Sequence, residues 1–289
     1  MEIKQIGKIV GGQDGAIFGG LLFRFGARGQ GYAYDLSAVD AESESEEAVE
    51  PLCGFTLDKA ELIVPHSNAV CFGTERFDES DEFPLLYSNV YNNYAKCEDR
   101  LVGVCCVYRL ERTEHSFKTT LVQLIEIGFT EDAELWRAYP DRDGARPYGN
   151  FLIDRDSGDY YAFVMRSEES GTRYFKFKAP SVSDGAWDEK YGVRRVTLTA
   201  QDILERFDCP YHRYIQGAAL HGGKIYSTEG FSNTENPPAI RVIDLAGRCQ
   251  TEHIDLWEAG YRHEPELIDF DGDRCYYSDN KGNLFLINW

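Results

Sequence analysis

A short β-rich pattern occurs five times along this chain of 289 residues and constrains the fold more than any other feature. Each copy has a few polar residues, an apolar run of strand length, a turn, and a second run rich in aromatic side chains. The copies begin at residues 13, 66, 148, 215 and 264. Repeated β units that cannot bury their own faces must pack against one another, and closing the stack into a ring gives a β-propeller.

The spacing of the copies predicts a five-bladed β-propeller closed by an N-terminal strand. Residues 264–289 are too few for a complete four-stranded blade. A strand over residues 2–10 would supply the missing outer strand and remove an exposed sheet edge. Six blades are the alternative, because two extra strand-like runs, at 102–110 and 120–127, follow the second start. We expect residues 1–289 to form a single all-β domain.

Two segments are expected to lie outside the strands. Thr199, with an acidic residue three positions later, predicts a short helix over residues 199–207. Residues 40–50 hold six carboxylates and no basic residue, which predicts a solvated loop between strands of the first blade.

Composition excludes several classes of function. The formal net charge of -19 repels phosphate backbones and anionic membrane surfaces, so we expect neither a nucleic-acid nor a membrane partner. No apolar run is long enough to span a membrane. The first residues lack the charged-then-apolar order of a secretory signal, which predicts a cytoplasmic protein. The eight cysteines are accordingly expected to be reduced and mostly buried thiols.

The starts of the five copies predict a polar pocket on the propeller axis. The first strand of each blade lies innermost, and strand side chains alternate, so the first and third positions of each start should share one face. These pairs are Gln13 and Gly15, His66 and Asn68, Tyr148 and Asn150, Ile215 and Gly217, and Glu264 and Glu266. On this pattern Asp14 falls off the axial register.

The residue types in this set predict the chemistry of the pocket. Oxygen ligands suit a hard cation, so a Ca²⁺ site is predicted at Glu264, Glu266, Asn68 and Asn150. His66 is the proton-transfer candidate, with the two glutamates as its catalytic partners. The predicted ligand-binding residues are Gln13, Asn68, Tyr148, Asn150, Gln216 and Arg146. The structural alternative is that these side chains cap strand ends and seal the channel around ordered water.

The chain resembles an uncharacterised group of bacterial β-propeller proteins over nearly its whole length. The likeness is strongest at Pro65–Asn68, Arg146–Asn150, Gln216–Gly217 and Glu264–Glu266. This resemblance implies a fold and no activity. The architecture is similar to that of five-bladed glycosidases, which take three carboxylates from different blades. Here both glutamates come from one blade, and the third blade offers Asn150. Calcium-dependent lactonase-like propellers also hold their metal with Glu and Asn side chains at the axis.

Two functions follow from these expectations. The first is binding of a small molecule or carbohydrate at the axial mouth, with metal-assisted hydrolysis of a sugar, lactone or related compound as its catalytic form. The alternative is a non-catalytic scaffold that binds proteins through its rim and long loops. The sequence leaves open whether the protein is an enzyme.

Overall fold

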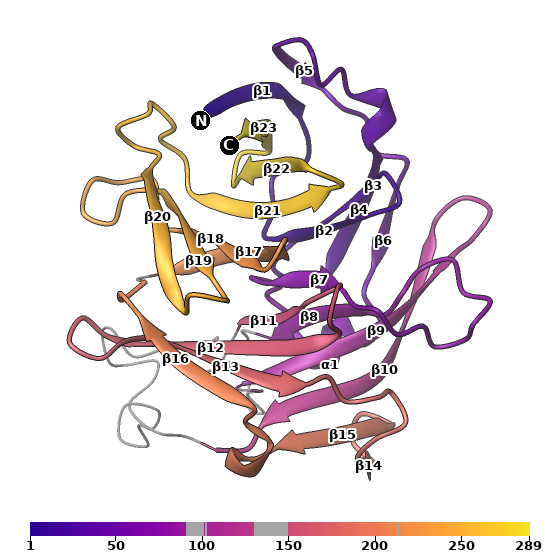
Figure 1. Ribbon diagram of the computed structural model, residues 1–289. Coiled ribbons are helices and arrows are strands. Elements are labelled where there is room, and N and C mark those ends of the chain that lie inside the picture. Colours follow the sequence, from indigo (N-terminus) through magenta and orange to yellow (C-terminus); the bar gives the residue numbers. More distant parts are fainter. Residues whose placement is uncertain (91–100, 102, 130–149, 213) are drawn as a thin grey trace.

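Five mainly antiparallel sheets form a propeller in the computed structural model, which describes residues 1–90, 101, 103–129, 150–212 and 214–289. Figure 1 shows the sheets arranged as blades, with the two chain ends side by side in the last one. The predicted five-bladed propeller closed by an N-terminal strand is confirmed. No helix in the described part of the chain is long and apolar enough to cross a bilayer.

The strands of each blade follow one another from the axis outward. The first blade contains β2 (Gly15–Phe18), β3 (Leu21–Phe25), β4 (Gln30–Asp35) and β6 (Cys53–Thr56). The second contains β7 (Val70–Phe72), β8 (Leu86–Val90), β9 (Val104–Arg112), β10 (Phe117–Ile127), β15 (Val193–Leu198) and β14 (Ala186–Asp188). The third contains β11 (Asn150–Ile153), β12 (Asp159–Ser167), β13 (Gly171–Lys178) and β16 (Glu205–Cys209).

The fourth blade contains β17 (Ile215–His221), β18 (Lys224–Glu229), β19 (Ala239–Asp244) and β20 (Cys249–Asp255). The fifth contains β21 (Pro265–Asp271), β22 (Arg274–Asp279), β23 (Asn283–Asn288), β1 (Glu2–Lys8) and β5 (Ser45–Ala48). Each of the five repeat starts therefore leads into the innermost strand of a blade. The six-blade alternative is wrong, because the extra runs that favoured it are β9 and β10 of the second blade.

The last blade is completed by two segments from the beginning of the chain. Strand β1 pairs antiparallel with β23, with Glu2 opposite Asn288 and Lys8 opposite Asn283. Strand β5 then pairs parallel with β1 and forms the sheet edge. The prediction of an acidic loop within the first blade is therefore wrong for Ser45–Ala48, although its two glutamates are exposed as expected.

The predicted helix over 199–207 is reduced to a single 3₁₀ turn, η2 (Ala200–Asp202). Thr199 caps it in the expected manner, and the Asp202 carboxylate accepts a hydrogen bond from the Thr199 amide at 2.7 Å. The chain then pairs with β13 as β16, because a sheet edge next to it needs a partner. Elsewhere the structure has the 3₁₀ turn η1 (Leu36–Ala38) and the helix α1 (Ala60–Ile63).

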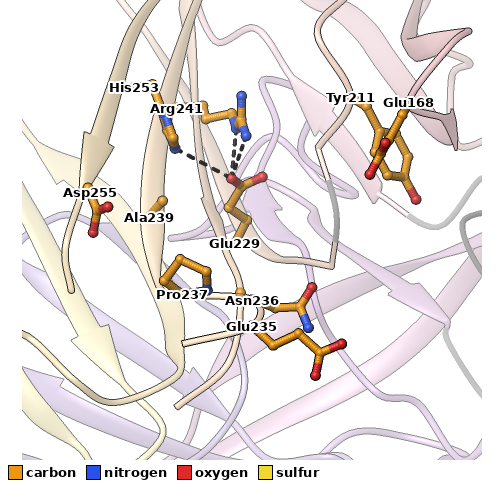
Figure 2. A pocket seen from close by; sticks show the side chains of 11 residues that line it. Glu168, Tyr211, Glu229, Glu235, Asn236, Pro237, Ala239, Arg241, His253 and Asp255 are labelled. Carbon is orange, nitrogen blue, oxygen red and sulfur yellow. Dashed lines mark hydrogen bonds and ion pairs between the residues drawn. The ribbon is translucent and has the colours of Figure 1, made fainter. Parts of the chain in front are cut away.

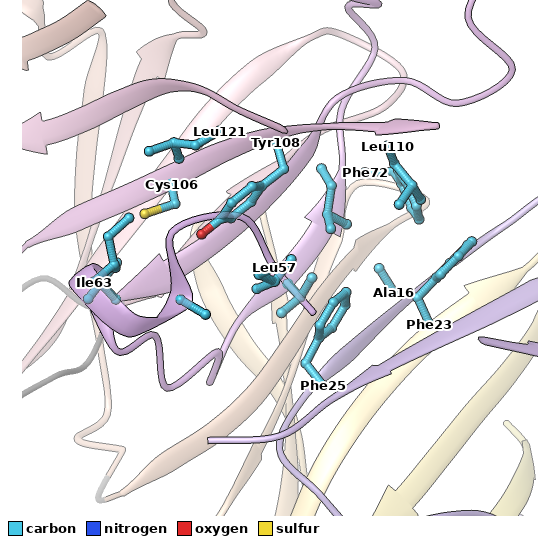
Figure 3. Packing of buried hydrophobic residues seen from close by; sticks show 14 of the residues in the cluster. Ala16, Phe23, Phe25, Leu57, Ile63, Phe72, Cys106, Tyr108, Leu110 and Leu121 are labelled. Carbon is cyan, nitrogen blue, oxygen red and sulfur yellow. The ribbon is translucent and has the colours of Figure 1, made fainter. Parts of the chain in front are cut away.

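The core lies in the layers between neighbouring blades. Figure 3 shows the layer between the first and second blades, where aromatic rings pack edge to face. The ring of Phe23 lies 5.5 Å from that of Phe72 and 5.1 Å from that of Phe117. Cys106 faces this layer, whereas the adjacent Cys105 faces the layer between the second and third blades, as strand alternation predicts. The seven described cysteines are free thiols, and most are buried.

Candidate functional site

A buried carboxyl group, that of Asp14, lies where the inner strands meet. Its Oδ2 accepts hydrogen bonds from the amides of Val70 at 3.0 Å and Ala218 at 3.5 Å, so it joins the inner strands of the second and fourth blades. Its own amide donates to the Ser67 carbonyl at 3.1 Å. The expectation that Asp14 falls off the axial register is therefore wrong.

Two β-bulges, at Gln216 and Glu266, break the strict alternation that the sequence prediction assumed. In β17, Ile215 lies opposite Glu229, but Gly217 lies opposite Thr228, so Gln216 is the extra residue. Glu266 is the corresponding extra residue in β21, between Pro265 and Leu267. A bulge re-aims its side chain and breaks the period of two. Gln216 therefore corresponds to Glu266, whereas Glu264 precedes the strand.

Side chains from four blades form one polar group, which we call the axial cluster. Gln13 Nε2 donates to Glu266 Oε1 at 3.3 Å, and Gln216 Nε2 donates to Glu264 Oε1 at 2.8 Å. Arg24, from β3, uses Nη2 to donate to the backbone carbonyls of Gly12 at 2.8 Å and Asp279 at 3.0 Å. The cluster consists of Gln13, Asp14, Arg24, Asn68, Gln216, Glu264 and Glu266.

Several polar atoms of this cluster are buried without a hydrogen-bond partner among the described residues. They are Gln13 Oε1, Asp14 Oδ1, Asn68 Oδ1, Glu266 Oε2 and two nitrogens of Arg24, Nε and Nη1. The exposed fractions of Asp14 and Arg24 are 0%, that of Glu266 is 2% and that of Asn68 is 7%. Folded proteins leave few such atoms unsatisfied, so a group of them at one place indicates a bound ligand or ordered water. Gln13 and Glu264 are only half-buried and connect the group to the surface.

The cluster has an excess of carboxyl groups over cations. Burial raises the pKa of Asp14 and of Glu266 well above the usual range, and it also raises the pKa of Glu264. Burial lowers the pKa of Arg24, although the negative charges of Glu266 and Asp14 oppose this shift. The cluster therefore holds one guanidinium and three carboxyl groups, whose pKa values are all raised by burial.

The backbone next to Asn68 is strained. Ser67 has a φ of 58°, in the left-handed region that residues other than glycine rarely adopt. It is fully buried, and its Oγ lies 3.0 Å from that of Ser88. Strain of this kind is concentrated at functional sites, where the surrounding packing maintains it.

The remaining predicted site residues are placed less completely. His66 is half-buried, and burial lowers its pKa to about 4, so the imidazole is neutral at pH 7. Asn150 begins β11, but its side chain lies outside what the structure describes. Arg146 and Tyr148 also lie outside the described residues.

The structure gives the predicted Ca²⁺ site limited support. Both oxygens of Glu264 already accept hydrogen bonds, from Gln216 and from Asn280 Nδ2 at 3.2 Å. In the described part of the chain, no group of three or more His, Cys, Asp or Glu side chains is arranged to hold a metal ion. Glu266 Oε2 and Asn68 Oδ1 remain as available oxygens. Calcium binding at these residues stays a prediction.

A second polar contact bridges the opposite ends of the inner strands. Arg155 donates to the carbonyls of Phe72 at 3.2 Å and Ile17 at 3.1 Å and lies 3.4 Å from the Asp269 carboxylate. The same carboxylate accepts from the Ile17 amide at 2.6 Å. Four blades are thereby tied together at the far end of the axis, and the unsatisfied atoms lie at the other end. Sequence reasoning missed Arg155 because it follows a strand within an ordinary turn motif.

An open pocket of about 420 Å³ adjoins the axial cluster in the fourth blade (Figure 2). Arg241 Nε donates to Glu229 Oε1 at 2.8 Å on one wall, and His253 lies beside the same carboxylate. The carbonyl of Gly230, which lines the pocket, accepts a hydrogen bond from Gln216 Nε2 at 3.2 Å. Other lining residues are Glu168, Tyr211, Glu235, Asn236, Pro237, Ala239 and Asp255. The pocket is therefore rich in carboxylates and adjacent to the axial cluster.

Comparison with known proteins supports the fold and no more. No family model matches the chain, and no curated protein matches it. Among solved structures, the chain is similar to the glutaminyl cyclase of Myxococcus xanthus, with a TM-score of 0.51 and 10% sequence identity. The match covers 100% of this chain and 94% of that protein. At this identity the likeness concerns the arrangement of the blades.

Proposed function

We propose that this propeller binds a small polar molecule, such as a carbohydrate or a related compound, at the axial cluster. The observation that carries the proposal is the group of buried polar atoms without partners in Gln13, Asp14, Arg24, Asn68 and Glu266. Such atoms cost free energy unless something hydrogen-bonds to them, and a pre-formed polar site at the mouth of a ring is a common solution.

The cluster also contains the groups needed for acid-assisted hydrolysis. Glu266 is a buried carboxyl group whose pKa is raised by burial, so it is suited to give a proton to a leaving group and to take one back from the attacking water. Gln13 fixes its other oxygen. Two free N–H groups of Arg24 are suited to stabilise a developing negative charge on a substrate oxygen. Hydrolysis of a sugar, lactone or similar small molecule is therefore the reaction class we propose. The similar propeller of known structure is named as an enzyme, which agrees with a catalytic role.

Thermal unfolding with a panel of ligands tests this function. The panel contains neutral sugars, sugar phosphates, lactones, amino compounds and Ca²⁺, each titrated to saturation. A ligand present at 100 times its Kd stabilises the folded state by about 2.7 kcal/mol. We expect at least one saturable rise in melting temperature that Glu266→Gln reduces to about half at the same ligand concentration.

The matched control is Glu258→Gln, because Glu258 is an exposed glutamate outside the cluster. It should leave the response unchanged. The proposal fails if no member of the panel gives a saturable response that depends on Glu266.

A further inference from the structure

Among the unsatisfied atoms of the axial cluster, hydrogen-bond acceptors outnumber nitrogen donors. Four are oxygens that accept hydrogen bonds, in Gln13, Asp14, Asn68 and Glu266. The two nitrogens without partners belong to one side chain, Arg24, and both donate. A ligand that satisfies this group must supply several donors and at least one acceptor.

The charges around these atoms are also unequal. Arg24 interacts electrostatically with the carboxyl groups of Glu266, Asp14 and Asp279. Glu266 also experiences the negative charge of Glu264. An anionic ligand would add to this excess. A polyhydroxyl compound supplies only one donor per hydroxyl group and no charge. A bare metal cation would satisfy the oxygens but would leave the Arg24 nitrogens without an acceptor.

We propose that the axial site takes a small molecule with a primary ammonium group beside an oxygen acceptor, the chemistry shared by amino-acid derivatives and amino sugars. This inference rests on the proposed function and specifies its ligand. The ammonium group donates three hydrogen bonds, and its positive charge favours the ionised form of the carboxyl groups, whose oxygens accept these bonds. The neighbouring oxygen accepts from Nε and Nη1 of Arg24.

The adjoining pocket agrees with a positively charged ligand. Its described lining residues include four carboxylates, those of Glu168, Glu229, Glu235 and Asp255, and one guanidinium, that of Arg241. Because concave surfaces lined by one sign of charge concentrate ions of the opposite sign, the pocket raises the local concentration of cations beside the cluster.

Isothermal titration calorimetry on the full chain tests the inference with paired probes. The amines are glucosamine and L-alaninamide, and the matched neutral compounds are N-acetylglucosamine, glucose and N-acetyl-L-alaninamide. Loss of a charge-assisted hydrogen bond weakens binding about tenfold or more. We expect this difference between each amine that binds and its N-acetylated partner. Binding of only one amine identifies the source as an amino sugar or an amino-acid derivative.

Variants of cluster residues test whether the difference in affinity between amines and neutral compounds arises at the axial cluster. Glu266→Gln should reduce the affinity for the amine about tenfold and leave that for the neutral compound unchanged, whereas Glu258→Gln should change neither. Gln13→Met is a second variant that tests the same site if Glu266→Gln folds poorly. Gln13 is half-buried at the outer edge of the cluster, so its replacement should disturb the fold less. It removes one acceptor and should weaken amine binding severalfold.

Two results overturn the inference, and they are distinguishable. If glucose or the N-acetylated compounds bind as tightly as the amines, and Glu266→Gln weakens both equally, the site is real but does not select ammonium groups. If neither amines nor neutral compounds bind, or only Ca²⁺ does, the ammonium site is excluded. Absence of any response that depends on Glu266 removes the proposed function as well.

Discussion

Two inner strands, β17 and β21, approach each other closely at Gly217, and this contact yields a sharp test of the structure. A Cβ atom added at this position would lie 2.0 Å from the backbone carbonyl oxygen of Glu266 and 3.1 Å from Asp14 Oδ1. Contacts under 3.0 Å are essentially never seen for a real Cβ, so Gly217→Ala must separate β17 from β21 by about 1 Å. The obstacle is backbone, which has no rotamer to change.

The expected loss follows from two opposing effects. Overpacking of this kind costs about 3 kcal/mol, at the upper end of its usual range because the ring holds both strands in place. Replacing glycine also reduces the entropy of the unfolded chain, which returns about 0.5–1 kcal/mol. We therefore expect a net loss of about 2 kcal/mol, or about 4 °C in melting temperature for a chain of this size.

Urea unfolding followed by tyrosine and tryptophan fluorescence measures this loss. The matched control is Gly54→Ala in β6, where the nearest atom to an added Cβ is 3.6 Å away, an ordinary contact. The control should be as stable as the natural chain or slightly more so. Equal stability of the two variants would refute the close approach of the inner strands.

Three further predictions concern buried polar groups and are measured by the same unfolding assay. Asp14→Ala should cost about 2 kcal/mol because the Val70 amide loses its acceptor, whereas Asp14→Asn keeps an acceptor oxygen and should cost less than half as much. Equal losses would contradict the role of this oxygen as the acceptor of the Val70 amide. Arg155→Met should cost about 2 kcal/mol, since it removes the donor to two buried carbonyls and the ion-pair partner of Asp269, but ligand affinity at the axial cluster should not change. Burial lowers the pKa of His212 from 6.5 to about 3. Below pH 6.5 this histidine is therefore protonated in the unfolded chain but neutral in the folded one, which destabilises the folded state. The natural chain should lose about 2 kcal/mol from this residue between pH 7 and pH 5, and His212→Gln should lose correspondingly less; parallel pH profiles would refute the assignment.

The blade pattern was predictable because it depends on short-range chemistry. Each repeat start combines polar residues, an apolar run and a turn, and these features are local to one hairpin. The closing role of β1 followed from the small number of residues left after Glu264. The edge strand β5 was not predictable, because its glutamates have low strand propensity and its pairing with β1 is decided by tertiary structure.

The candidate site was predicted in position but only partly in composition. Gln13 contacts Glu266, Gln216 contacts Glu264, and Asn68 is buried with an unsatisfied oxygen. The bulges displaced the alternation by one residue, and a bulge has no reliable sequence signal. Asp14 lies outside both bulged strands, directly before β2, and was missed because the alternation placed Gln13 and Gly15 on the axial face instead.

Arg24 was missed for a different reason. It is the one charged residue in the otherwise apolar strand Leu21–Phe25 and is fully buried. A charge inside such a run is costly unless it has partners, so its position was itself a signal of the polar cluster.

Pairing of β1 between β23 and β5 has a consequence for how the chain is made. Residues 2–8 leave the ribosome long before their main partner, β23, is synthesised. In the interval β1 is an unpaired strand, and unpaired strands can pair with strands of other molecules and cause aggregation. β5 becomes available much earlier, and its carboxylates repel a second acidic chain. We expect removal of the charge at Glu46 and Glu47 to increase aggregation during expression while leaving the mature protein as stable as before.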